Sequence, residues 1–151
     1  RKLYQEKEIS SIKSLLKRDL SHLSIKNDDY EIVELSIGDE YVYLNKLGQI
    51  NLLKIDVEGW EMTVLEGFTE SLKTNKIDIC QFEYGHAHIE QRLNFRDFYN
   101  FFSNYNYKLG IIKPNGKINF IEKYDEIYEN YYCTNYLALS HKILSSKIKF
   151  S

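Results

Sequence analysis

The chain has 151 residues, a length that suits one domain. Hydrophobic residues make up 43% and aromatic residues 15%, which is enough for a packed core and excludes a disordered segment. The net charge of −2 excludes an overall basic field, so we expect no nucleic-acid partner and no membrane partner. No apolar run approaches the roughly 20 residues that span a bilayer, and no signal-peptide pattern is present.

The two cysteines, Cys80 and Cys133, are too few for a disulfide framework. Cys80 falls within an apolar strand pattern, which favours a buried free thiol. Free thiols indicate a reducing setting, so we expect a cytoplasmic protein. The chain begins at Arg1 without an initiator Met, which favours a start produced by cutting a longer chain.

Residues 1–23 are predicted to form an amphipathic helix, because apolar side chains recur at three- and four-residue steps. The apolar positions are Ile9, Ile12, Leu16, Leu20 and Leu23. We interpret this face as packing on a sheet or a partner; a membrane-surface helix is the alternative, disfavoured by the mixed charge of its polar face. A short strand is expected over 30–35, and the segment 37–42 is ambiguous between strand and helix.

The middle of the chain predicts a strand–helix–strand unit. The apolar run within 49–56 indicates a buried strand. The spacing of apolar residues over 60–73 indicates a helix, and the apolar positions of 76–83 indicate a second strand. Such a unit makes the two strands parallel neighbours joined by a right-handed crossover. Ligands of open α/β sheets bind at the rim formed by the carboxyl ends of such strands.

The remainder predicts one helix and three strands. The helix is expected over 94–105, with Asn94 as its N-cap. A strand over 107–113 should turn at Pro114-Asn115-Gly116 and return as a hairpin through residue 121. A last strand falls within 130–139, and 143–151 forms a basic tail.

Asp56 and Glu83 are the leading candidates for chemistry, because each ends one of the two predicted parallel strands. Neighbouring strands lie about 5 Å apart, so the two carboxylates should converge. They would then share a divalent metal, or act as a general base on a substrate hydroxyl. The structural alternative is that each carboxylate only caps a loop or a helix N-terminus.

The residues around Asp56 give weaker signals. Gly59 favours a tight turn and a close approach of ligand to backbone. Glu58 lies in that turn, and the helix dipole alone is sufficient to explain Glu61 in the first helical turn. Lys54 reaches either a substrate or a structural ion-pair partner.

His86 and His88 follow Glu83 in a predicted loop. His-x-His is a weak metal signal without a third fixed ligand, and loop histidines are more often solvent-facing. A substrate or general-base contact for His86 is the stronger functional hypothesis. Trp60 is interpreted as filling an aromatic core, with a sugar or aromatic pocket as the alternative.

The segment Lys-Ile-Asp-Val-Glu-Gly-Trp-Glu over 54–61, followed by Val-Leu-Glu-Gly over 64–67, resembles the signature of the FkbM-type methyltransferases. Those enzymes use S-adenosylmethionine (SAM) on a Rossmann-like sheet. Supporting matches are Gln-Phe-Glu-Tyr-Gly over 81–85, the Asn-Gly turn at 115–116 and Asn-Tyr-Leu-Ala over 135–138.

This resemblance runs from about 38 to 140 and implies the C-terminal half of the family's α/β fold. Parallel strands, flanking helices and an antiparallel edge made by the last two strands are expected. The chain then divides into an N-terminal helix and linker (1–37), the methyltransferase-like part (38–142) and the basic tail (143–151).

The resemblance implies a SAM-dependent O-methyltransferase that acts on a hydroxyl of a sugar or natural product. Asp56 and Glu83 would be catalytic, or ligands of a divalent metal. Substrate contacts would come from Lys54, Glu58, Gly59 and His86.

The family's SAM site lies on earlier strands with a Gly-rich turn, and none of the seven glycines here is arranged Gly-x-Gly. We therefore expect this fragment alone to be inactive and not to bind SAM. The alternative function is a non-catalytic methyltransferase-like module that binds a glycan or partner. Its exposed sheet edge would favour a dimer.

Overall fold

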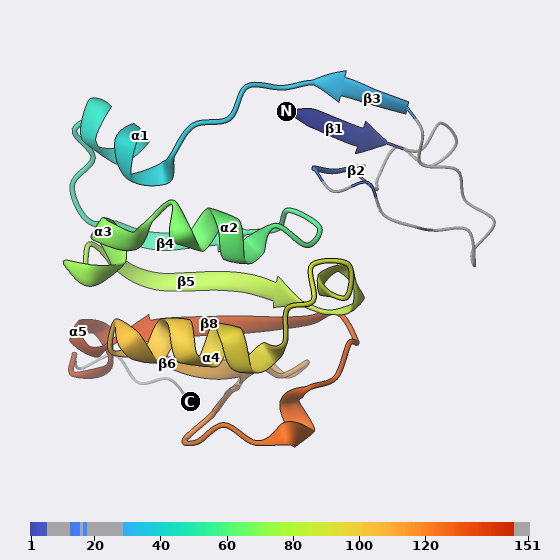
Figure 1. Ribbon diagram of the computed structural model, residues 1–151. Coiled ribbons are helices and arrows are strands. Elements are labelled where there is room, and N and C mark those ends of the chain that lie inside the picture. Colours follow the sequence, from blue (N-terminus) through green and yellow to red (C-terminus); the bar gives the residue numbers. More distant parts are fainter. Residues whose placement is uncertain (6–12, 16, 18–28, 147–151) are drawn as a thin grey trace.

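A five-stranded mixed sheet organises the computed structural model, which describes residues 1–5, 13–15, 17 and 29–146 (Figure 1). Its strands lie in the order β4-β5-β8-β6-β7. β4 and β5 are parallel, as the strand–helix–strand pattern predicted, and the other neighbouring pairs are antiparallel. The strands are β4 (Ile50–Ile55), β5 (Ile77–Tyr84), β6 (Tyr107–Ile112), β7 (Ile118–Phe120) and β8 (Thr134–Ser140).

The connection between β4 and β5 contains two short helices where the sequence predicted one. They are α2 (Glu61–Glu66) and α3 (Thr69–Lys73). The break is held by Asp39 at the start of α1 (Gly38–Leu44), which resolves the ambiguous segment as a helix. The Asp39 carboxylate accepts hydrogen bonds from the amides of Glu70 and Ser71 at 2.7 and 3.0 Å, so α1 caps α3 from outside.

One face of the sheet carries an aromatic core under α2, α3 and α4 (Phe95–Asn104) (Figure 1). The Phe82 ring lies at its centre and stacks on Phe98 and Phe102 of α4, with ring centroids 5.1 and 5.3 Å apart. The Tyr136 ring of β8 packs 5.6 Å away on another side. Strand alternation therefore directs every second residue of β5 into this core, as the apolar pattern predicted.

The last strand of the chain does not lie at the sheet edge, contrary to the expectation for the last two strands. β8 is inserted between β5 and β6, and the β6–β7 hairpin forms the edge instead. The reason is burial, because Tyr136, Ala138 and Leu139 are all within the core. At the opposite end of the order, β4 pairs on its outer side with no strand among the described residues.

A small antiparallel sheet replaces the helix predicted at the N-terminus. Its order is β2-β1-β3, with β1 (Lys2–Gln5), β2 (Lys13–Ser14) and β3 (Asp29–Ile32). Cross-strand pairing overrides the helical periodicity: Tyr4 lies opposite Tyr30, and their rings are 5.9 Å apart. The five apolar positions on which the helix prediction rests all lie outside the described residues.

Three short helices complete the described chain. They are η2 (His86–His88) and η3 (Glu126–Tyr128), both 3-10 helices, and α5 (His141–Leu144). α5 follows β8 directly, and Lys142 forms an ion pair with the buried Asp78 at 3.4 Å.

Glu129 joins the segment before β8 to the start of α4. Its carboxylate accepts hydrogen bonds from the amides of Phe95 and Arg96 at 2.7 and 3.0 Å. The hydroxyls of Tyr124 and Tyr84 donate to it at 2.7 and 3.2 Å. Burial alone would raise the pKa of Glu129, but these four hydrogen bonds outweigh burial and lower it.

We predict that Glu129→Gln lowers the free energy of unfolding by about 1–3 kcal/mol at pH 7, because it weakens bonds to a charged acceptor. The pKa is lower in the fold, so this contribution is present above the unfolded pKa of about 4.3 and fades as the pH falls below it. Urea denaturation at pH 7 and pH 3 measures both effects. The exposed Glu126→Gln is the control; an equal loss in both variants would contradict the prediction.

Candidate functional site

Asp56 and Glu83 lie beside each other at the carboxyl end of the parallel pair. Ile55 pairs with Phe82 in the β4–β5 register. The residues that follow them, Asp56 and Glu83, are therefore neighbours at the ends of the two strands. Alternation directs both side chains to the face opposite the aromatic core. Asp56 is exposed, and its Oδ2 accepts from Lys54 Nζ at 2.7 Å; Glu83 is partly buried.

The carboxylates of this rim affect one another. Burial raises the pKa of Glu83, and the negative charges of Glu58 and Asp56 raise it further. A hydrogen bond with Cys133 acts in the opposite direction without reversing the shift. Glu83 therefore holds a proton more readily than an ordinary glutamate, which suits a group that takes a proton from a substrate.

The turn between β4 and α2 is held in an uncommon backbone conformation. Glu58 has a φ of 53° and Gly59 a φ of 103°. A Cβ at Gly59 would lie 2.7 Å from the carbonyl oxygen of Ala87, so the turn tolerates only glycine there. The predicted close approach at Gly59 is thus to the backbone of the neighbouring turn.

The buried side chain of Glu61 holds this turn in place through hydrogen bonds. Its carboxylate accepts the amide of Val57 at 3.0 Å and the amide of Gly59 at 2.9 Å. Its Oε2 also lies 2.8 Å from Nε2 of His88, and the two side chains are only 2% and 1% exposed. Gln91 adds a side-chain hydrogen bond to the carbonyl of Gly59.

The roles of Glu61 and His88 differ from those expected. The helix dipole does not suffice to explain Glu61, and His88 is buried rather than solvent-facing. The pair joins the turn after β4 to the turn after β5, a contact that spacing along the chain does not reveal. The only sequence signal is that each residue lies a few positions beyond a strand end.

His86 lies on the exposed side of the second turn. Its Nδ1 is 3.2 Å from Sγ of Cys133, a residue that the sequence did not single out. Burial and then the charge of Glu83 raise the pKa of Cys133, so the thiol stays protonated at neutral pH. The rim therefore combines Glu83 of β5, His86 of η2 and Cys133, the residue directly before β8.

A metal role for Asp56 and Glu83 gains no third ligand from the structure. Within residues 1–5, 13–15, 17 and 29–146, no group of three or more His, Cys, Asp or Glu side chains is arranged to hold a metal ion. Both cysteines of the chain are free thiols. Among the same residues, no helix is long and apolar enough to cross a membrane.

Residues 4–109 match the family described as Methyltransferase FkbM domain. The chain belongs to this family. The match begins at the small sheet, well before the first residue of the resemblance noted in the sequence, and ends within β6. It includes the turn after β4 and the whole of the rim on β5 and η2. No curated protein and no solved structure matches the chain.

The family supports a methyltransferase role in general terms. The structure is an α/β fold in which helices flank a mixed five-stranded β-sheet. This arrangement is compatible with a methyltransferase fold. In this FkbM-domain chain, the signature segment 54–61 contributes the exposed Lys54 and Asp56 and the half-buried Glu58 to the rim. The buried Gly59 forms the turn, and Glu61 is the buried anchor.

We predict that Glu61→Ala lowers the free energy of unfolding by about 3–5 kcal/mol, because it leaves a buried histidine and two amides without their partner. Asp56→Ala should cost at most about 1 kcal/mol, because its ion pair with Lys54 is exposed. Thermal and urea denaturation of both variants measures the difference. Equal costs would show that Glu61 is not the anchor of the two turns.

We also predict that Glu58→Gln lowers the pKa of Glu83, and that Asp56→Asn lowers it by less. Removal of a neighbouring negative charge makes ionisation easier, and Glu58 has the larger effect of the two. NMR titration of the labelled Glu83 carboxyl carbon measures the shift. Glu70→Gln, on the exposed surface of α3, is the control; an unchanged pKa in Glu58→Gln would contradict the convergence of the three carboxylates.

Proposed function

We propose that this FkbM-domain chain is the acceptor-binding part of a SAM-dependent O-methyltransferase with a Rossmann-like sheet. The observation that carries the proposal is the register of Asp56 and Glu83 at the carboxyl ends of two parallel strands. This rim is where open α/β sheets bind ligands. The acceptor is a hydroxyl of a sugar or natural product, and the setting is cytoplasmic, as the free thiols favour.

Transfer of a methyl group to a hydroxyl requires that the hydroxyl lose its proton as the new O–C bond forms. Glu83 is the proposed proton acceptor, because burial and its neighbours raise its pKa toward the working range of a base. Asp56 lies beside it and orients the acceptor, because the single proton of the reacting hydroxyl goes to Glu83. Lys54 holds Asp56 in place at 2.7 Å.

Glu58, Gly59 and His86 contact the rest of the acceptor in this proposal. Glu58 contributes charge next to Glu83, and the Gly59 turn shapes one wall of the rim. His86, exposed on η2, supplies a ring nitrogen on the opposite wall. A divalent metal between Asp56 and Glu83 would require water or acceptor oxygens as its other ligands.

The described residues fit SAM only in charge. SAM would supply an activated methyl group on a positively charged sulfur, and the carboxylates of the rim complement that charge. No Gly-x-Gly turn is present to cradle the nucleoside or the amino-acid end. We therefore assign those ends to no residue of this chain, and expect no heat when the 151-residue chain is titrated with SAM.

The test is methyl transfer by the natural protein that carries this chain, with labelled SAM and extracts of the source cells as acceptor. Asp56→Asn and Glu83→Gln should each lower turnover by about 10²–10⁴-fold and leave SAM affinity nearly unchanged. Glu58→Gln should move the acid limb of the pH profile to lower pH, because Glu83 then ionises more easily.

Exposed Glu70→Gln on α3 serves as the matched control and should keep full turnover. Wild-type turnover in both Asp56→Asn and Glu83→Gln would refute the catalytic rim. Absence of methyl transfer by the unaltered protein would favour the alternative, a non-catalytic module whose open β4 edge, with Leu52 56% exposed, binds a second chain.

A further inference from the structure

A polar cleft of about 490 Å³ lies beside the carboxylate rim, on the face of the five-stranded sheet opposite the aromatic core. This volume is in the range of small-molecule sites, about 300–1,000 Å³. The cleft is formed by β5, by the start of the β6–β7 hairpin and by the segment that enters β8. Its lining includes Gln81, Ile112, Lys113, Pro114, Cys133 and Asn135.

The cleft and the rim lie on the same face of the sheet. Gln81 and Glu83 are alternate residues of β5, so their side chains point to the same side. Asn135 is paired with Glu83 in the β5–β8 register, and side chains at such positions lie about 5 Å apart. Cys133, which lines the cleft, also forms a hydrogen bond with Glu83. A molecule in the cleft therefore reaches Glu83 without crossing the sheet.

The floor of the cleft presents a hydrogen-bond donor and an acceptor side by side. Nε2 of Gln81 donates to Oδ1 of Asn135 at 3.0 Å, which holds the two amides together. Oε1 of Gln81 and Nδ2 of Asn135 make no hydrogen bond within the described part of the chain. Gln81 is partly buried and Asn135 is exposed, so a ligand has access to both. Two adjacent hydroxyls of a sugar ring match this pair, because one donates while the other accepts.

The wall on the far side from Glu83 is aliphatic and positively charged. The β6–β8 register places Ile112 beside Asn135, and the exposed Lys113 and Pro114 follow it. Lys113 forms no ion pair with any other described residue. The cleft therefore has the carboxylates of the rim at one end and an ammonium group at the other.

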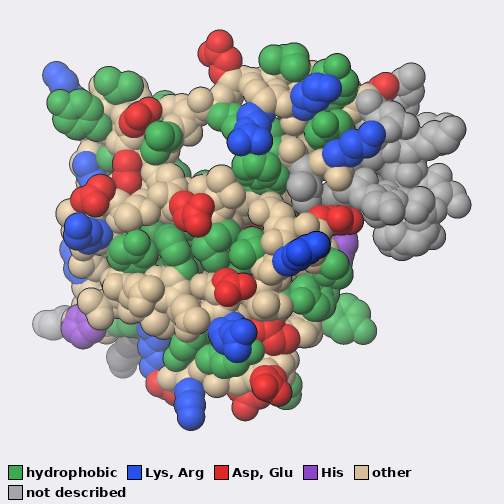
Figure 2. Space-filling view, viewed as in Figure 1, with side chains coloured by type: hydrophobic (Ala, Val, Ile, Leu, Met, Phe, Trp, Pro, Cys, Tyr) green, Lys and Arg blue, Asp and Glu red, His purple; other side chains and the backbone are tan. Residues whose placement is uncertain are grey.

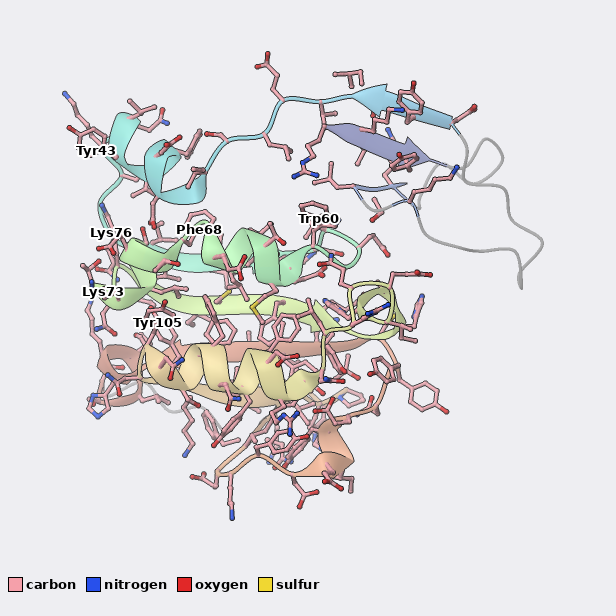
Figure 3. The ribbon with its side chains drawn as sticks, in the orientation of Figure 1. Tyr43, Trp60, Phe68, Lys73, Lys76 and Tyr105 are labelled. Atoms are coloured by element: carbon pink, nitrogen blue, oxygen red, sulfur yellow. The ribbon has the colours of Figure 1, made fainter. Side chains whose placement is uncertain are left out.

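A second cleft, which is largely apolar, lies on the opposite side of the molecule. It is bounded by α1, α2 and the N-terminal segments, and Figure 2 shows the hollow between the small sheet and the body of the molecule. Figure 3 shows two of its lining residues, Trp60 and Phe68, on the side of α2 that faces away from the five-stranded sheet. Trp60 therefore lines a cleft and does not fill the aromatic core, contrary to the preferred interpretation of the sequence. Because the sheet separates this cleft from the rim, the polar cleft is the one that serves Glu83.

We propose that the polar cleft binds an anionic sugar, with two adjacent hydroxyls at Gln81 and Asn135 and a carboxylate or phosphate at Lys113. The proposal rests on the proposed function and deepens it, because the bound sugar is the methyl acceptor. Charge sets the direction of binding: the carboxylates of the rim repel the anionic group and Lys113 attracts it. The hydroxyl at the opposite end of the sugar then lies next to Glu83 and gives up its proton to that carboxylate.

The test compares methyl glucuronide with methyl glucoside, which share their ring hydroxyls and differ in a carboxylate in place of a hydroxymethyl group. NMR titration of isotope-labelled protein without SAM measures both affinities, and the side-chain amide signals of Gln81 and Asn135 report on the cleft itself. The glucuronide should shift both signals and bind about fivefold more tightly than the glucoside, the upper range for an exposed ion pair. Glucose 6-phosphate identifies the anion: tighter binding than the glucuronide assigns a phosphate, and weaker binding assigns a carboxylate.

Lys113→Gln should weaken glucuronide affinity about fivefold and leave glucoside affinity unchanged. Gln81→Met, which keeps an unbranched side chain, should weaken both sugars about fivefold, the effect of one lost hydrogen bond. Lys117→Gln is the matched control, since Lys117 is exposed on the same hairpin but does not line this cleft.

The proposal is overturned if the two glycosides bind equally, if Lys113→Gln or Gln81→Met binds the glucuronide like the unaltered protein, or if Lys117→Gln weakens binding as much as Lys113→Gln. Binding with the expected variant pattern, in a protein that never transfers methyl groups, would keep the cleft and remove the proposed function. Methyl transfer that depends on Glu83, with the same acceptor KM in Lys113→Gln, would keep the proposed function and overturn the sugar site.

Discussion

The buried carboxylate of Glu61 fixes the relative position of the two turns on which the candidate site depends. It holds the amides of Val57 and Gly59 on one side and contacts His88 on the other. The turn after β4 and the turn after β5 are therefore one unit. Because a carboxylate with amide partners is costly to move within a low-dielectric interior, the exposed groups on those turns are presented on a rigid base.

The candidate site thus has a buried layer and a more exposed layer, which have different roles. Glu61 and His88 lie inside, at 2% and 1% side-chain exposure, and maintain geometry. Asp56 is exposed and Glu83 half-buried, and burial, followed by the charges of Glu58 and Asp56, raises the pKa of Glu83. The positive φ of Glu58 lies in the turn that joins the two layers, and functional sites often hold such uncommon conformations.

The sequence predicted the parallel pair, the helix α4 and the hairpin because each depends on local signals: apolar alternation, a cap and an Asn-Gly turn. It also placed Asp56 beside Glu83, since register follows from two strand ends. Contacts between distant segments carry no such signal.

Three features depend on contacts between distant segments, which local sequence patterns do not predict. They are the Glu61–His88 pair, the Cys133–His86 contact and the insertion of β8 between β5 and β6. The N-terminal prediction was wrong at 2–5 and 13–14 because cross-strand pairing decided the structure there and helical spacing did not.

Lys54 has a consequence beyond the chemistry of the rim. It lies on β4, the outermost strand of the five-stranded sheet, and its ammonium group is exposed. A charged side chain on an edge strand disfavours pairing of that edge with a strand of another molecule. The residue that pairs with Asp56 is therefore also a charge on the open edge, and a neutral β-branched side chain at that position would remove the ion pair and the edge charge together.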